Sequence, residues 1–200
     1  MDSQQWVMTS PPHCVVDYAA AVYKDGSIYL ITYGDNPICL YNIKDNSWFS
    51  LNTTAGIPVA CVVSAGIIEN TIYACGKSVC RKYDIETGQW QPIRSIPNVD
   101  DWPRIIALNG LVYSIGGWGP EHPVSSVSVY RPATDTWTSL KSMPEGRYTH
   151  SLTIVDGKIY VIGGYTGESE ITNTVLFTIR KWIVGLWDRR FKHLEAVFLQ

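Results

Sequence analysis

Short apolar runs separated by turn-forming residues recur along the chain. Leu152 to Val155 and Lys158 to Ile162 flank Asp156-Gly157, a dipeptide typical of a tight β-hairpin. Asp25-Gly26 and Asn109-Gly110 repeat this arrangement. Before the C-terminal segment, no stretch shows the sustained helical period with capping residues that indicates an α-helix. The pattern therefore predicts strands that pair as antiparallel hairpins.

Two series of aromatic residues repeat with a common period. The first is an aliphatic residue followed by tyrosine, with steps of 44, 40 and 47 residues: Ile28-Tyr29, Ile72-Tyr73, Val112-Tyr113 and Ile159-Tyr160. The second is a tyrosine followed seven residues later by a tryptophan: Tyr41 and Trp48, Tyr83 and Trp90, Tyr130 and Trp137. A period of roughly 40 to 50 residues is typical of β-propeller blades. We therefore expect each repeat to form one four-stranded antiparallel blade.

Glycine pairs follow the second strand of two repeats, at Gly116-Gly117 and Gly163-Gly164, where a missing side chain lets backbone segments approach closely. Together with the hairpin turns and the two aromatic series, they resemble the kelch repeat, most clearly from Leu108 to Leu140. The resemblance implies an all-β, partial kelch-type β-propeller of about four four-stranded antiparallel blades with a non-kelch C-terminal tail. It also implies that the repeated glycines, tyrosines and tryptophans are structural residues that pack blade against blade.

The repeats divide the chain into a kelch region at 14–177, with units at about 18–51, 59–93, 103–140 and 146–177, and two flanking segments. Residues 1–13 are predicted to be the last strand of a preceding blade, because Trp6 stands 42 residues before Trp48. Phe177 stands 13 residues after Gly164, as Tyr130 does after Gly117, so we assign Phe177 to the tyrosine series.

The pattern ends in the divergent tail, 178–200. The tryptophan that the spacing requires at position 184 is Val184. We expect Lys181 to Phe198 to form a short helix or to be disordered. The number of repeats favours a truncated or alternatively spliced propeller with open edges that could self-associate. The alternative is a closed four-blade ring completed by Gln4 to Met8.

Charge and cysteine content limit the classes of partner and site that the sequence predicts. Sixteen Lys and Arg residues against eighteen Asp and Glu residues give a nearly neutral chain, which excludes nucleic acid as a first choice of partner, and no segment predicts a membrane span. The five cysteines include no C-x-x-C pair, so no disulfide framework or zinc site is expected, and Cys75 and Cys80 are predicted to be buried thiols. We expect a cytoplasmic protein.

No constellation of residues predicts catalysis. The four histidines, His13, His122, His150 and His193, are scattered singly, and His150 is predicted to be a hydrogen-bonded structural residue. Asp100-Asp101 is interpreted as solvated charge in a loop. We therefore expect neither a cofactor nor a metal ion, and no enzymatic activity.

A partner-binding site is predicted in the loops instead, because propellers hold variable loops on a rigid scaffold. The resemblance to kelch adaptors that pair a BTB or F-box domain with the propeller implies arginines at the channel mouth that bind acidic or phosphorylated peptides. Arg104 and Arg147 match such positions, and the alternative is that they form salt bridges to a neighbouring blade. Aromatic residues nearby could anchor a partner: Trp102, Trp118, Tyr148 and Tyr165.

The function predicted first is a protein-interaction module, similar to the substrate-recognition part of kelch adaptors of cullin-type ubiquitin ligases. Binding to actin or the cytoskeleton is an alternative within the same class. An enzyme such as a sugar isomerase or an oxidase is the alternative of a different class, because a fold does not decide a function.

Overall fold

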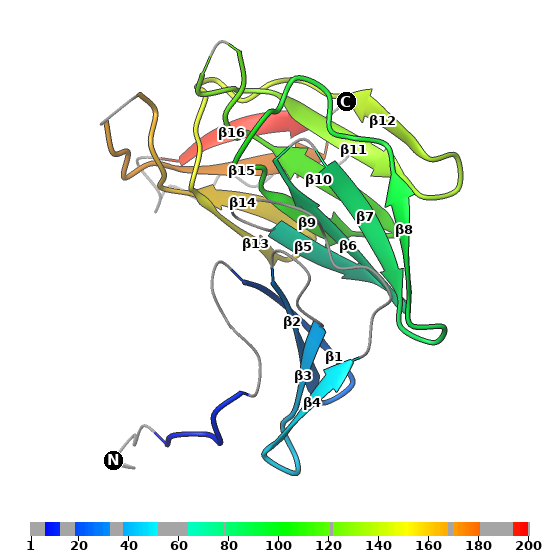
Figure 1. Cartoon of the computed structure of the whole chain (residues 1–200). Coiled ribbons are helices and arrows are strands. Elements are labelled where there is room, and N and C mark those ends of the chain that lie inside the picture. The colour runs from blue at the N-terminus through cyan, green and yellow to red at the C-terminus, as the bar shows by residue number, and fades with distance from the viewer. Residues whose placement is uncertain are drawn as a thin grey trace.

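Strands account for all the regular structure in the described part of the chain. The structure is a computed structural model that describes residues 7–12, 19–32, 38–51, 64–77, 79–120, 122–167, 170–180 and 194–199. The described residues form sixteen strands, which are labelled in Figure 1. They are β1 (Ala20–Lys24), β2 (Ser27–Ile31), β3 (Ile38–Asn42), β4 (Ser47–Leu51), β5 (Ser64–Ile68), β6 (Thr71–Gly76), β7 (Val79–Asp84), β8 (Gln89–Ile93), β9 (Ile105–Leu108), β10 (Leu111–Ile115), β11 (Val127–Arg131), β12 (Thr136–Ser139), β13 (Ser151–Val155), β14 (Lys158–Ile162), β15 (Val175–Arg180) and β16 (Leu194–Leu199). The described residues include no helix long and apolar enough to cross a membrane.

The strands form four sheets of four strands each, and consecutive strands are neighbours throughout. We name these sheets blade 1 (β1–β4), blade 2 (β5–β8), blade 3 (β9–β12) and blade 4 (β13–β16). Tight hairpins occur where the sequence predicted them: at Asp25-Gly26, Asn109-Gly110 and Asp156-Gly157 the strands reverse through residues of positive φ. The all-β propeller of four four-stranded blades is thereby confirmed.

The last strand of blade 4 differs from its counterparts. β16 pairs with β15 in parallel, whereas every other neighbouring pair is antiparallel. The antiparallel expectation is therefore wrong for this one pair, and the helix expected in the tail is wrong for residues 194–199. A short apolar run fits a strand or a buried helix equally well by periodicity, and here the free edge of β15 provides a pairing partner. Residues 181–193, which include Val184, lie outside the described residues.

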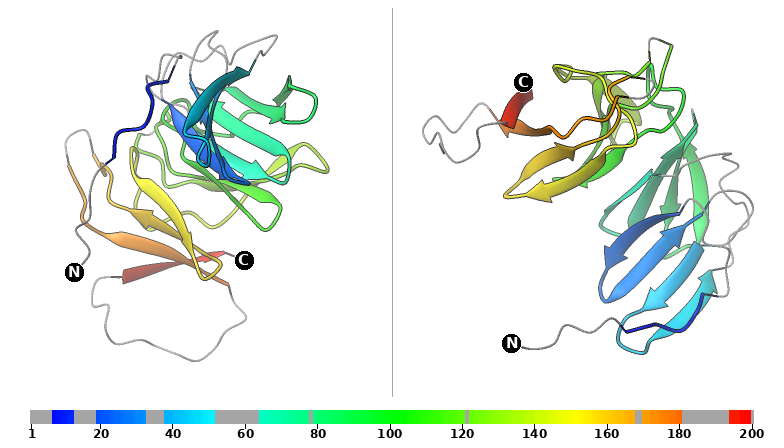
Figure 2. Two further views of the ribbon diagram at one scale, coloured as in Figure 1. Left: turned by 90° about the horizontal axis from the view of Figure 1, so that it is seen from below. Right: turned by 90° about the vertical axis from the view of Figure 1, so that its left-hand side faces the viewer.

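The blades follow one another in an arc (Figure 2), with blade 1 and blade 4 at its two ends. The first strands of the blades, β1, β5, β9 and β13, contact one another in this order, so they line the inner side of the arc. Each blade thus presents one face to the blade before it and one face to the blade after it. We call these the backward face and the forward face.

Each junction between blades is filled by its own cluster of buried apolar side chains. The tyrosines of the first aromatic series lie on forward faces, and those of the second series lie on backward faces. The junction of blades 1 and 2 contains Tyr29, Ile31, Ile72 and Tyr83. The junction of blades 2 and 3 contains Tyr73, Cys75, Ile105 and Tyr130, and that of blades 3 and 4 contains Tyr113, Ile115, Ile159 and Leu176.

Blade 4 departs from this scheme in β15. Phe177 pairs with Tyr160, whereas Tyr130 of blade 3 pairs with Val112, the residue before the corresponding tyrosine. Thr178 takes the equivalent of the Tyr130 position, and its hydroxyl group accepts a hydrogen bond of 2.9 Å from the Ile159 amide. The assignment of Phe177 to the tyrosine series is therefore wrong, because the register of β15 is shifted by one residue and its side chains exchange faces.

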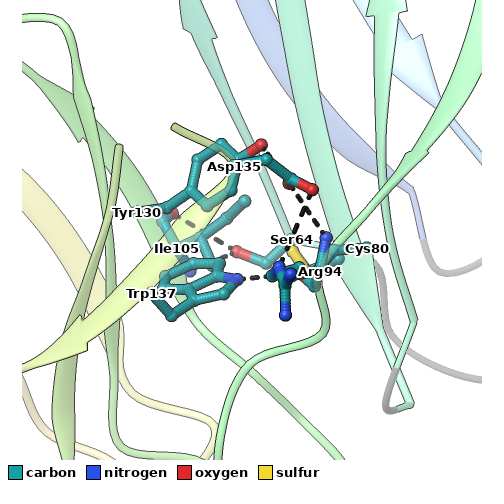
Figure 3. Close-up of a disulfide and its surroundings, with 8 residues drawn as sticks. Ser64, Cys80, Arg94, Ile105, Tyr130, Asp135 and Trp137 are labelled. Carbon is teal, nitrogen blue, oxygen red and sulfur yellow. Dashed lines mark hydrogen bonds and ion pairs between the residues drawn. A yellow bond between two sulfur atoms is a disulfide. The ribbon is translucent and has the colours of Figure 1, made fainter. Parts of the chain in front are cut away.

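A clasp ties blade 3 to the link that precedes it (Figure 3). In blade 3, the indole NH of Trp137 donates to the Arg94 carbonyl oxygen at 2.8 Å, and a carboxylate oxygen of Asp135 accepts from the Arg94 amide at 3.2 Å and from the Tyr130 hydroxyl at 2.8 Å. The hydrogen bond from Tyr130 is the main cause of the lowered pKa of Asp135. Three side chains and the backbone of one link segment thus form a single local network.

Blade 1 repeats the clasp with the chain that precedes it. The indole NH of Trp48 donates to the Ser10 carbonyl oxygen at 2.6 Å, and Asn46 accepts from the Ser10 amide at 3.3 Å and from the Tyr41 hydroxyl at 2.9 Å. Residues 7–12 therefore lie on blade 1 as the link from β8 to β9 lies on blade 3. The rest of the segment predicted to be a strand, residues 1–6 and 13, lies outside the described residues.

Blade 2 contains a disulfide that the sequence analysis did not predict. Cys75 and Cys80 face each other directly across the β6–β7 hairpin, with an S–S distance of 2.11 Å, and both are buried at the junction with blade 3. Cys39 is also disulfide-bonded. The prediction of buried thiols at Cys75 and Cys80 is therefore wrong, because a tight hairpin brings together cysteines that are five positions apart.

Candidate functional site

One edge of the propeller carries the longer connections, and the opposite edge carries tight turns. Because each blade is a meander, the loops between second and third strands emerge at the same edge as the links between blades. We call this the loop edge. In blades 3 and 4 these loops span residues 116–126 and 163–174, whereas the corresponding loop of blade 2 spans only residues 77–78. Any surface for recognition beside blades 3 and 4 is therefore built from these loops and links.

Three aromatic rings stack at this loop edge. Tyr148, in the link between β12 and β13, lies between Trp102 of the preceding link and Tyr165 of the β14–β15 loop. Its ring centroid is 5.2 Å from that of Trp102 and 5.4 Å from that of Tyr165, with interplanar angles of 23° and 27°. Tyr148 is buried, whereas the outer two rings are partly exposed. The stack therefore has a rigid centre and two accessible ends.

A second pair of rings extends the stack on one side. Trp118 packs edge-on against Trp102 at 5.7 Å and against Tyr148 at 4.9 Å. The exposed imidazole of His122 packs edge-on against Trp118 at 4.5 Å. We call these five residues, Trp102, Trp118, His122, Tyr148 and Tyr165, the aromatic cluster. The four aromatic residues predicted to anchor a partner thus lie together, and His122, interpreted as an isolated histidine, joins them.

Backbone pairing holds the cluster in place. Asp101 and Trp118 form a β-bridge, as do Tyr148 and Tyr165. A carboxylate oxygen of Asp101 also accepts from the Trp102 amide at 2.8 Å, and Trp102 adopts a positive φ of 45°. Asp101 is therefore a structural residue of the loop rather than solvated charge. A strained conformation of a bulky residue persists only where surrounding contacts impose it, and such residues concentrate at binding sites.

Gly117 permits this arrangement, because a β-carbon there would approach Val99 to 2.8 Å and the carbonyl oxygens of Asp101 and Trp102 to 3.2 and 3.3 Å. Its φ of 118° also disfavours any other residue. The equivalent close contacts of Gly164 are with Tyr148 and His150. The diglycines therefore let the loops approach the links that carry the aromatic cluster.

Arg104 follows Trp102 by two residues in the same link and is partly exposed. Its Nε donates to the His150 carbonyl oxygen at 3.0 Å, which connects blade 3 to blade 4. Among the described residues no carboxylate forms an ion pair with Arg104. Burial lowers the pKa of the guanidinium group from its usual value. This cation is therefore held in place without a counter-charge, as a site for an acidic ligand requires.

Arg147, the second predicted arginine, is used within the fold. Only 1% of its surface is exposed. Its guanidinium group donates to the Gly163 carbonyl oxygen at 3.2 Å and to the Thr174 hydroxyl at 3.0 Å, and it lies 3.5 Å from a Glu145 carboxylate oxygen. The ion pair is thus with a residue of the same link and not, as in the alternative weighed above, with a neighbouring blade. Because it is buried, Arg147 does not contribute to an exposed surface.

His150 lies beneath the two arginines and is 1% exposed. Burial, followed by the charges of Arg104 and Arg147, lowers its pKa to about 3. The nearby carbonyl oxygens of Ile115 and Arg147 would raise the pKa of His150, but neither ring nitrogen has hydrogen-bonding geometry to a partner. Burial therefore has the largest effect on this pKa. The imidazole is therefore neutral, and the hydrogen bonds expected for it are absent.

The described residues offer no other chemical site. They contain no group of three or more His, Cys, Asp or Glu side chains placed to hold a metal ion. A shallow depression of about 360 Å³ lies beside the clasp of blade 3 and is lined by Arg94, Ser95, Pro97, Thr136 and Trp137. The aromatic cluster and Arg104 are thus the grouping of exposed side chains with the clearest capacity to bind a ligand.

Comparison with known families agrees with this geometry. The kelch motif family matches residues 104–144 and 146–176, which are blade 3 and most of blade 4. Blades 3 and 4 are kelch repeats within a β-propeller of four blades. Blades 1 and 2, where Tyr33-Gly34 and Cys75-Gly76 replace the diglycine, share the fold of the matched kelch repeats. A comparison with curated proteins finds no match.

Proposed function

We propose that this kelch propeller binds a protein or peptide at the loop edge of blades 3 and 4. Kelch propellers are commonly protein-interaction modules, and the observation that supports a site here is the aromatic cluster. Rigid, partly exposed tryptophan and tyrosine rings are the side chains that dominate binding energy at interfaces. Trp102, Trp118 and Tyr165 would act as anchors, while the buried Tyr148 keeps them in position.

Arg104 would make the proposed site prefer an acidic ligand. A guanidinium group in the link that carries Trp102, with no acidic partner among the described residues, can form two parallel hydrogen bonds with one carboxylate or phosphate. The preferred ligand would therefore be a peptide that combines an acidic or phosphorylated residue with an apolar one. An interaction role is favoured over catalysis, because His150 is buried and neutral and cannot contact a substrate.

The resemblance to kelch adaptors extends the proposal to substrate recognition for a cullin-type ubiquitin ligase in the cytoplasm. Recognition of an acidic segment through the propeller's loop edge is the step that this chain would contribute. Cytoskeletal binding remains the second candidate within the same class, and the ligand selected in the experiment below distinguishes the two.

The experiment is a selection of peptides from a displayed random library on the immobilised chain, followed by affinity measurements on the enriched peptides. We expect enrichment of Asp, Glu or phosphorylated residues, and at least tenfold weaker binding to Arg104→Ala and Trp118→Ala. Arg104→Lys should recover only part of the affinity, because lysine cannot form the bidentate contact. Phe49→Ala, which removes an aromatic ring that is 51% exposed on blade 1, is the matched control and should bind normally.

Two results would contradict the proposal. One is that no peptide is enriched over the same library selected on the Trp102→Ala, Arg104→Ala double variant. The other is that Phe49→Ala weakens binding as much as Trp118→Ala does, since the aromatic cluster would then have no special role.

A further inference from the structure

The three junctions between blades are built in the same way, and each end of the arc has only one of the two faces that a junction needs. At each junction the forward face of one blade packs on the backward face of the next. Among the described residues, the forward face of blade 4 and the backward face of blade 1 have no blade packed against them (Figure 2). The proposed function does not use these two faces.

The forward face of blade 4 exposes apolar side chains at positions that are buried on the other forward faces. The residue two positions after the first-series tyrosine is 1% exposed in blades 1, 2 and 3, where it is Ile31, Cys75 and Ile115. In blade 4 the equivalent residue, Ile162, is 42% exposed. Tyr160 is likewise partly exposed, and it stacks on Phe177 at 5.5 Å on the same face. The shifted register of β15 thus adds an aromatic ring to an apolar face that lacks a partner.

The backward face of blade 1 is its counterpart. Tyr23 is 63% exposed, whereas Ile67 and Ile154, the equivalent residues of blades 2 and 4, pack into junction clusters. Ala21 is also exposed, whereas its equivalent in blade 3, Ile105, is 4% exposed. Blade 1 therefore presents a face of the kind that a forward face covers at each of the three junctions.

The contacts within the chain predict which residues would meet. At the junction of blades 2 and 3, Gly66 lies against Ala107, and a β-carbon on Gly66 would be 3.0 Å from the Ala107 amide nitrogen. The strand pairing makes Thr153 of blade 4 the equivalent of Gly66, and Tyr23 of blade 1 the equivalent of Ala107. A forward face of blade 4 packed on a backward face of blade 1 would therefore place Thr153 against Tyr23.

We propose that two copies of this chain close one ring of eight blades, with blade 4 of each copy packed on blade 1 of the other. The occupant is a second copy because the face that fits blade 4 is a backward face, and blade 1 carries one on which no blade packs among the described residues. Within one chain the two faces lie at opposite ends of the arc. Two such junctions related by a twofold axis leave no face uncovered, and eight blades are within the range of known propellers.

The first test is the molar mass of the 200-residue chain by light scattering after size exclusion. We expect twice the chain mass of 22.4 kDa. Ile162→Glu and Tyr23→Glu should each give monomers, because each places a charge in one half of both junctions. Both side chains are exposed in a single copy, so a thermal melt should show that the monomers remain folded. Ile171→Glu, at a residue that is 75% exposed in the β14–β15 loop, is the control and should remain dimeric.

The second test uses cysteine pairs to establish which faces meet. A chain with Thr153→Cys is mixed with a chain with Tyr23→Cys, a short bismaleimide reagent is added, and cross-linked peptides are mapped by mass spectrometry. We expect a cross-link between residues 153 and 23 of different chains, and none when Ile171→Cys replaces Thr153→Cys.

A monomeric wild-type chain would overturn the proposal and would indicate that blades of a longer chain or another protein cover these faces. In a chain carrying both cysteines, a 153–23 cross-link confined to monomers would overturn it in favour of a closed four-blade ring. A dimer disrupted by only one of the two glutamate variants would also overturn it, because a face would then pack on its own copy.

Discussion

In blade 3 the aromatic residue of the third strand, Tyr130, lies on the backward face and is 1% exposed. In blade 4 the aromatic residue at the same distance from the diglycine, Phe177, lies on the forward face and is partly exposed. Both blades match the kelch motif, and their first two strands pair in the same register. The difference shows that the same spacing of residues can bury a ring in a junction or leave it on a surface, because a register shift of one residue exchanges the faces.

The largest expected effect tests this difference directly. Tyr130→Ala should lower the free energy of unfolding by about 4 kcal/mol, since it removes a fully buried ring and its hydrogen bond to Asp135. Phe177→Ala should cost only about 1 kcal/mol, because the ring is already partly solvated. Urea unfolding monitored by tryptophan fluorescence measures both. Equal losses would show that Phe177 is buried as Tyr130 is.

The first glycines of the two diglycines should also respond differently. A β-carbon on Gly116 would approach the Arg147 carbonyl oxygen to 2.4 Å and His150 Cε1 to 2.9 Å, whereas one on Gly163 would have no neighbour closer than 3.5 Å. Both residues have a positive φ near 60°. Gly163→Ala should therefore cost about 1 kcal/mol from backbone strain alone. Gly116→Ala should cost about 3 kcal/mol because overpacking is added. The same urea titration would contradict this difference if the two losses were similar.

The junction between blades 3 and 4 should weaken in mild acid because of His150. Its pKa is about 3 in the folded state and near 6.5 in the unfolded chain, so the unfolded chain binds the proton first as the pH falls. Between pH 7 and pH 5 this should reduce the free energy of unfolding by about 2 kcal/mol. His150→Phe should remove this part of the pH dependence. His122→Phe, at an exposed ring, should retain it, and the opposite order would show that His150 is not the titrating group.

The smallest expected effect concerns the clasp, which blade 3 has and for which the described part of blade 4 shows no equivalent. Trp137→Phe keeps a ring against Tyr130 but removes the donor to the Arg94 carbonyl oxygen, so we expect a loss of about 1 kcal/mol. Trp48→Phe should have a similar effect through Ser10. Unfolding free energies of the two variants provide the measurement, and a loss confined to Trp137→Phe would show that residues 7–12 are not held on blade 1 by the indole.

The sequence was sufficient to predict the blades, because their determinants are local. Hairpin dipeptides specify tight turns wherever they occur, and the period of the aromatic residues reports the size of the repeat. The grouping of Trp102, Trp118, Tyr148 and Tyr165 followed from placing them in loops and links, since those connections emerge at one edge of every meander.

The remaining features depend on contacts between segments, which spacing does not reveal. Thr178 rather than Phe177 occupies the position of Tyr130, because pairing with β14 rather than distance from the glycines sets the register of β15. Arg147 precedes the first strand of its blade, as Arg104 does, yet it is buried and donates hydrogen bonds to oxygens of Gly163 and Thr174. His122 joins the aromatic cluster through a ring contact that no local pattern encodes.

The clasp of Trp48 on Ser10 and of Trp137 on Arg94 also has a consequence for assembly. The two residues of each clasp are separated by 38 and 43 residues along the chain, which is less than the length of one repeat and its neighbouring link. Contacts of such short range close quickly once both partners are available. During synthesis on a ribosome, blades 1 and 3 can therefore each lock onto the segment made just before them, without waiting for the C-terminus to emerge.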